Sequence, residues 1–324
     1  MAGVAPQKSG PVPQELDLPG GKSGFRNWLD RNAWRDIIIA VPYIWLILFF
    51  VAPFIIIIAM SLAQSVIAQP PFRFYDTWPY VTFENFERLF SDYVYLRGYL
   101  TSLRNALIAT ALCLLLGYPM ALGIARAKGV WRNILLLLVI LPFWTSFLLR
   151  VYAWIGMMGS NSWFNRGLTY TINAFLPAAW EINFVPMMNS NFAVILVVVY
   201  SYLPFMILPL FANLEKLDFT LNEAAMDLGS RPMQVFRDVT LPLSIPGIVA
   251  GCLLVFIPAT GELVIPSLVG NAGDPMIGRV INDEFSLNRH WPMASTIAVA
   301  LLMLLVVPIM LYNRMQERAA EGAK

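Results

Sequence analysis

Charged residues are scarce in this chain of 324 residues: 13% are Asp, Glu, Lys or Arg, whereas 58% are hydrophobic and the mean hydropathy is +0.64. A soluble domain of this length would carry about twice that share of charge. The net charge of +2 is too small, and its basic residues too dispersed among loops, to favour nucleic-acid binding. The composition therefore indicates a membrane protein.

Cysteine and histidine are almost absent. Cys113 and Cys252 both fall within long apolar runs, so we expect them to act as small apolar residues and not as a disulfide or metal pair. The single histidine, His290, has no Cys or His neighbour in the sequence, which offers no metal site. A phosphate-binding G-x-x-x-x-G-K-[ST] loop is also missing, and the Gly270–Gly273 stretch lacks its lysine. We expect no cofactor, and ATP must be bound by another chain.

Six apolar runs are long enough to cross a bilayer as helices. The first is too long for a cleavable signal peptide and follows a polar tail. The sequence therefore predicts an all-α, polytopic membrane protein with six transmembrane helices, at Ile37–Leu62, Asn105–Ala125, Ile134–Met158, Phe192–Asn213, Ile245–Val269 and Ser295–Asn313.

The distribution of Lys and Arg predicts the orientation. If the N-terminus is inside, the cytoplasmic segments hold fourteen of these residues and the outer segments hold seven. Basic residues favour the cytoplasmic side, and the short loop from Arg126 to Arg132 shows the bias most clearly. Both termini are therefore expected to be cytoplasmic.

The runs and their flanks also predict the domain organisation. Residues 1–24, rich in Gly, Pro and Ser, are expected to form a disordered cytosolic tail. Residues 25–36 alternate aromatic and basic residues, as in an interfacial helix, before the first span at 37–62. An outer loop at 63–101 precedes a core at 102–313, which contains a polar loop at 214–244, and a second cytosolic tail follows at 314–324.

The polar loop carries a spaced motif: Glu223-Ala224-Ala225, then Gly229, then Val239-x-Leu241-Pro242. Thr220 and Glu223 have the spacing of a capping box that opens a helix. Gly229 is placed to end that helix in a left-handed conformation, and Ser230 with Pro232 can open a second one. Two short helices are therefore expected, either as a docking loop or as an ordinary solvated hairpin.

This spacing resembles the coupling loop of permease subunits in binding-protein-dependent ABC importers, E-A-A, G and I-x-L-P, from which Val239 is the one departure. The first permease subunit of bacterial putrescine or spermidine importers is the closest likeness. The further segments that carry it are Leu141–Trp154, Tyr202–Pro209, Phe256–Pro266 and Met276–Arg279.

The resemblance implies a type I ABC importer permease in the bacterial inner membrane, embedded in lipid and without enzymatic activity of its own. In that family a second permease completes the pore, two ATPase subunits bind the cytosolic loops, and a periplasmic binding protein delivers the polyamine. The residues matching the coupling loop here are Glu223, Ala224, Ala225, Gly229, Leu241 and Pro242.

Two ionisable side chains lie deep in the predicted spans. Arg150 and Glu262 are about 17 and about 18 residues into runs that both lead outward, so a rise of about 1.5 Å per residue puts them at similar depth. Such residues usually face a partner or a cavity. They could form a structural ion pair, Arg150 could reach the outer headgroups, or Glu262 could line the translocation path.

Asp283 and Glu284 precede the last span on the outer side. They could form an acidic entrance for a cationic substrate. The alternatives are a solvated loop or a contact with the binding protein.

Other functions remain open on the sequence. An ABC importer for a different substrate, such as iron(III) or an opine, would share the coupling loop. A secondary transporter would show internal repeats or buried acid–base relays, and the coupling loop argues against it. A membrane enzyme would need clustered nucleophile and base groups within the spans, and the sequence shows none.

Overall fold

The computed structural model describes residues 36–74, 81–175 and 182–321. The predicted tail at 1–24 lies outside this range, as does all of the predicted interfacial helix except Asp36. Two compact units, divided after Ile56, are described separately. The first ends within a helix that spans Asp36–Ser61 and includes a π-helical turn, η1 (Ile47–Val51), and α2 (Ala52–Ser61). Ala52 follows this turn, and the next residue, Pro53, has no N–H to donate to the helix.

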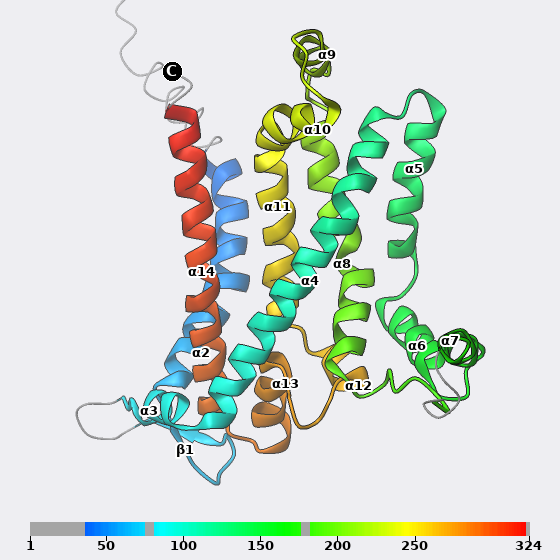
Figure 1. Ribbon diagram of the computed structural model, residues 1–324. Helices are drawn as coiled ribbons and strands as arrows, with labels where there is room; N and C mark the ends of the chain where they lie inside the picture. The colour runs from blue at the N-terminus through cyan, green and yellow to red at the C-terminus, as the bar shows by residue number, and fades with distance from the viewer. Residues whose placement is uncertain (1–35, 75–80, 176–181, 322–324) are drawn as a thin grey trace, which may run out of the picture. The chain divides into compact units, whose positions relative to one another are not determined.

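Three long helices form the centre of the second unit: α4 (Tyr93–Arg126), α8 (Asn191–Leu214) and α11 (Leu241–Thr260). They pack against one another along their lengths (Figure 1). Small residues permit the approach, since a Cβ added to Gly251 would lie 2.8 Å from Sδ of Met206 and one added to Gly247 would lie 2.6 Å from Cβ of Asn213. The side chains of Asp92 and Ser190 cap the first turns of α4 and α8.

The predicted third span is broken. Instead of one helix over Ile134–Met158, the chain forms α5 (Val130–Ile140), a 3-10 turn η2 (Leu141–Trp144) and α6 (Phe147–Met158), with a bend of 89°. Pro142 lies at the start of η2, and Thr145 and Ser146 are extended, which ends the helical hydrogen bonding there. A further helix, α7 (Trp163–Asn173), follows α6.

The fifth predicted span is interrupted too. The helix ends at Thr260, and α12 (Val264–Val269) begins only after a turn at Gly261–Leu263. Gly278 of the next helix, α13 (Ile277–Asn282), lies against this turn. A Cβ there would be 2.5 Å from the carbonyl oxygen of Gly261, so this position requires glycine.

The remaining elements lie at the ends of the bundle or complete it. The predicted outer loop at 63–101 contains a two-stranded antiparallel hairpin, β1 (Gln64–Ser65) and β2 (Phe72–Arg73), and a short helix, α3 (Glu84–Ser91). Its last part is already helical, because α4 begins at Tyr93. After α13 a π-helical turn, η5 (Asp283–Leu287), leads into α14 (Trp291–Glu321).

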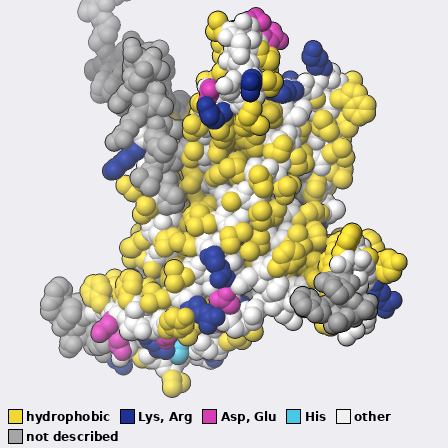
Figure 2. All heavy atoms as spheres, viewed as in Figure 1, with side chains coloured by type: hydrophobic (Ala, Val, Ile, Leu, Met, Phe, Trp, Pro, Cys, Tyr) yellow, Lys and Arg dark blue, Asp and Glu magenta, His cyan; other side chains and the backbone are white. Residues whose placement is uncertain are grey.

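The described residues confirm an all-α membrane protein. Four helices are long and apolar enough to cross a bilayer, at Asp36–Ser61, Tyr93–Arg126, Asn191–Leu214 and Pro232–Thr260, and the bent pair supplies a fifth. The apolar part of α14, Trp291–Val307, corresponds to the sixth predicted span. Figure 2 shows hydrophobic side chains covering the middle of the second unit, with charged ones gathered toward its two ends.

Candidate functional site: a two-helix loop and an outer network

The polar loop forms the two short helices that the motif predicts. They are α9 (Thr220–Asp227) and α10 (Pro232–Val235), and they project at one end of the bundle (Figure 1). A π-helical turn, η4 (Phe236–Thr240), joins α10 to α11 without a break. The hydroxyl of Thr240 donates to the side-chain oxygen of Asn222, 3.4 Å away, and so links α9 to the start of α11.

Two of the predicted caps are wrong, because α9 starts one residue earlier than a cap at Thr220 requires, and α10 starts one residue later than a cap at Ser230 requires. Thr220 is the first helical residue of α9, and Oδ1 of Asp218 accepts from its N–H at 3.0 Å. This backbone hydrogen bond lowers the pKa of Asp218. At α10 the side-chain oxygen of Gln234 accepts from the N–H of Arg231 at 2.8 Å, so Arg231 and not Ser230 precedes the helix, while Pro232 takes its first position as expected.

Gly229 has the predicted left-handed conformation, with φ of +89°. The N–H of Gly229 donates to the carbonyl of Met226 at 2.9 Å, and the N–H of Ser230 donates to that of Ala225 at 3.1 Å, which closes the C-terminus of α9. A Cβ at Gly229 would meet no atom within 4 Å. The requirement for glycine is therefore one of backbone conformation and not of space.

The two helices expose apolar side chains that nothing in the described chain covers. Leu228 is 89% exposed and Met233 is 75% exposed, and Leu221 and Met226 are also exposed. Glu223 and Ala224 are exposed on α9, and Ala225 is half-buried. Phe236 points inward instead, since its ring meets that of Tyr118 edge-on at 5.6 Å. Leu241 and Pro242 form the first turn of α11, behind this surface.

Glu262, at the opposite end of α11, is only 7% exposed. Its Oε1 accepts from the N–H groups of Val264 and Ile265, at 3.0 Å and 3.4 Å, and so caps α12. Its Oε2 accepts from the hydroxyl of Tyr202 on α8, at 2.5 Å. The carboxylate therefore holds the interrupted helix against α8.

Arg150 does not pair with Glu262. Its guanidinium lies over the rings of Phe143 and Phe147, at 5.8 Å and 5.7 Å, and its buried Nε and Nη1 have no hydrogen-bond partner among the described residues. The bend before α6 also invalidates the argument for equal depth, because the third run does not rise as one straight helix. The prediction of a structural ion pair between Arg150 and Glu262 is therefore wrong.

The two acidic residues of η5 have different environments. Asp283 lies 3.8 Å from Nε of Arg279 and is partly exposed. Glu284 is 9% exposed, and its carboxylate accepts from the hydroxyl of Tyr95 at 3.2 Å and lies 3.1 Å from Nδ1 of His290. The alternative that Glu284 lies in a solvated loop is therefore wrong, and its side chain instead joins η5 to α4.

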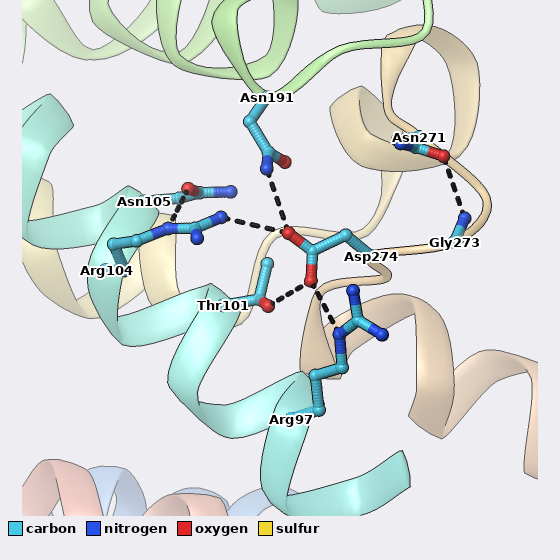
Figure 3. Close-up of polar contacts among 8 residues, drawn as sticks. All are labelled: Arg97, Thr101, Arg104, Asn105, Asn191, Asn271, Gly273 and Asp274. Atoms are coloured by element: carbon cyan, nitrogen blue, oxygen red, sulfur yellow. Dashed lines mark hydrogen bonds and ion pairs between the residues drawn. The ribbon is translucent and has the colours of Figure 1, made fainter.

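A network around Asp274 was missed by the sequence analysis (Figure 3). Oδ1 of Asp274 accepts from Nε of Arg97 at 3.2 Å and from the hydroxyl of Thr101 at 2.6 Å. Oδ2 accepts from Nη2 of Arg104 at 3.0 Å and from the side-chain amide of Asn191 at 2.9 Å. The loop before α13 is therefore fastened to the first turns of both α4 and α8.

The same contacts keep Asp274 ionised. Burial opposes the charge, but hydrogen bonds from Thr101 and Asn191, followed by the contact with Arg104, hold the pKa at about 2. The spacing of Arg97, Thr101 and Arg104 puts all three on one helical face, and this signal could have indicated an acidic partner.

Together, a bundle of membrane-spanning helices and a two-helix loop between two of them define a transport permease. The chain belongs to the family described as "Binding-protein-dependent transport system inner membrane component", whose model matches residues 113–321.

Relatives of known name agree. The "Spermidine/putrescine transport system permease protein PotB" of Haemophilus influenzae is 38% identical over 284 residues, which cover 88% of this chain and 94% of the relative. The protein of the same name from Escherichia coli K12 is 37% identical over 274 residues, covering 83% and 93%. A crystal structure of a bacterial ABC transporter that imports the polysaccharide alginate contains a chain with a TM-score of 0.66 at 18% identity, covering 91% of this chain and 99% of that one. The fold is that of a type I ABC importer permease.

Proposed function

We propose that this chain is the permease subunit of an ATP-driven importer of polyamines, putrescine or spermidine. The observation that carries the proposal is the identity of 37–38% to spermidine/putrescine permeases over most of the chain. A permease performs no covalent chemistry, so the work of this chain is to change conformation when its partners bind and hydrolyse ATP.

The partners follow from the same proposal. They are a second homologous permease, two ATP-binding subunits and a periplasmic polyamine-binding protein. The family description names a binding protein, and a related alginate importer was crystallised with its periplasmic protein. The exposed apolar side chains of α9 and α10 offer an ATPase subunit a contact surface that would otherwise face water.

In the proposed orientation α9, α10 and both termini are cytoplasmic. Lys128 and Arg132 lie at the same end of the bundle as α9, and basic residues favour the cytoplasmic side, which supports this orientation. In a variant without Cys113 and Cys252, a cysteine at Lys128 should resist a membrane-impermeant maleimide in intact cells, whereas one at Asn282 of α13 should react. Labelling at position 128 would contradict the orientation.

The function is tested with the purified complex. Purification of the complex should yield the three kinds of partner, and in the presence of the binding protein, putrescine or spermidine should stimulate ATP hydrolysis several-fold. Iron(III) and an opine serve as comparison substrates. Stimulation by either of these, and not by a polyamine, would assign the permease to the alternative importer class.

We propose that Gly229 sets the angle at which α9 and α10 meet the ATPase subunit. In the Gly229→Val variant a β-branched residue would have to adopt positive φ, at a cost of about 1 kcal/mol or more. Polyamine uptake should fall severalfold while the amount of membrane-inserted protein stays normal. Gly229→Asn is the matched control, because asparagine tolerates this conformation and should retain most uptake. If the Gly229→Val variant shows wild-type uptake, the proposal that Gly229 sets this angle is wrong.

Glu262 is the proposed carboxylate of the translocation path. A polyamine loses its hydration on entering the bundle, and acidic groups and aromatic faces can replace it. Tyr202 donates to this carboxylate, and its ring lies 5.9 Å from that of Phe205, so both kinds of group meet here. Asp283 is the proposed outer acidic residue of the entrance.

The Glu262→Gln variant separates charge from capping. Its side-chain oxygen can still accept from the N–H groups of α12, so assembly and basal ATP hydrolysis should persist, whereas polyamine uptake should fall about tenfold or more through the lost charge contact. Glu87→Gln, which neutralises an exposed carboxylate of α3 at the same end of the bundle, is the control and should transport normally. Normal uptake by the Glu262→Gln variant would exclude the path role. Arg150→Gln should not rescue the Glu262→Gln variant, since the two side chains do not pair.

A further inference from the structure

A cavity of about 780 Å³ lies between the end of α4 and the two-helix loop. One wall is formed by the last turn of α4, the α4–α5 connection and the start of α5. The other is formed by α9, α10 and η4. The cavity therefore touches both a membrane span and the loop proposed to contact the ATPase.

The lining carries an excess of positive charge. Arg126, Lys128 and Arg132 contribute to one wall, and Glu223 is the only acidic residue among the lining residues. Arg132 is already paired with Glu215 and stacked on Phe211. Arg126 lies over the ring of Phe219 at 5.6 Å, and within the described chain neither Arg126 nor Lys128 forms an ion pair. Their charges are therefore available to an anion.

Apart from Asn222 and Thr240, the rest of the lining is apolar or glycine. Leu122, Ala125, Met226, Val235 and Phe236 face the same cavity. A free phosphate ion would gain nothing from these side chains. A ligand with a phosphate beside hydrocarbon would use both parts of the lining, since basic pockets between membrane helices on the cytoplasmic side suit the head groups of anionic lipids.

We propose that this cavity binds the phosphate head group of an anionic phospholipid of the inner leaflet. Arg126 and Lys128 hold the phosphate, and the apolar residues contact the glycerol and the first carbons of the acyl chains. A lipid in this position bridges α4 to α9 and α10, and so steadies the loop against the span. The proposal rests on the cytoplasmic orientation of this end and not on the identity of the transported substrate.

The test uses the complete importer in nanodiscs that contain a trace of photoreactive phosphatidylglycerol or photoreactive phosphatidylcholine. Phosphatidylglycerol should label the peptide containing residues 122–132 in the wild-type complex, and phosphatidylcholine should label it much less. The double variant Arg126→Gln/Lys128→Gln should lose this labelling about tenfold or more, because both charge-assisted contacts to the phosphate are removed.

The matched control is Lys216→Gln/Arg237→Gln. It removes the same charge from two exposed residues of the same loop that do not line the cavity. This variant should be labelled like the wild type. If both double variants lose labelling equally, the effect is one of net charge at the membrane surface and the proposed site is wrong.

Further arms identify other occupants. Inorganic phosphate at millimolar concentration should not compete with the lipid, and competition would assign the cavity to a phosphate from solution. If phosphatidylglycerol labels the wild-type complex no more than background, an ATPase subunit and not lipid fills the cavity. If the double variant does not assemble, the charge-preserving variant Arg126→Lys should still be labelled, and its failure would contradict the proposal. None of these measurements needs a polyamine, so the proposed function can fail while this site stands.

Discussion

The main constraint on this structure is that backbone N–H and C=O groups within a bilayer have no water with which to form hydrogen bonds. Long helices such as α4 and α8 satisfy them internally. The interruption between α11 and α12 does not, and there the carboxylate of Glu262 accepts from the N–H groups of Val264 and Ile265. The acidic side chain at this interruption thus has a structural use before any transport role is assigned to it. Because Gly278 packs against the same turn, α13 leaves the interruption little freedom to rearrange.

The end of the bundle opposite the two-helix loop is held by side chains, whereas its middle is held by close helix packing. Asp274 joins α4, α8 and the loop before α13, and Glu284 joins α4 to η5. Both carboxylates have several donors, which offsets the cost of removing them from water. Interactions of this kind fix the relative positions of three elements at once. An opening of this end would have to break these contacts or carry the whole network along.

The sequence predicted those features of the fold that depend on residues close together in the chain. The two short helices and the left-handed Gly229 depend on composition, proline and glycine within a few residues, and they appear in the structure. Among the described residues, four of the six predicted spans appear as long apolar helices. The caps at Thr220 and Ser230 failed by one residue, because Asp218 accepts from the N–H of Thr220 and Gln234 accepts from the N–H of Arg231 instead. Tyr202, which donates to Glu262, and the partners of Asp274 belong to distant segments of the chain. No spacing within one segment could therefore have supplied them, although the face shared by Arg97, Thr101 and Arg104 indicated that α4 needed an acidic partner.

The path from the loop to the outer end can be followed through one helix. From Pro232 to Thr260 the chain is helical without interruption, so α10, η4 and α11 connect the loop directly to the turn at Glu262. A rigid helix transmits a displacement over its whole length, whereas a flexible connection would absorb it. We infer that movement of α10 by an ATPase subunit displaces the turn at Gly261, where the helix ends and where Tyr202 and Gly278 contact Glu262. Gly229 separates α9 from this helix, and for that reason we propose that its conformation determines how a force applied to α9 reaches α11.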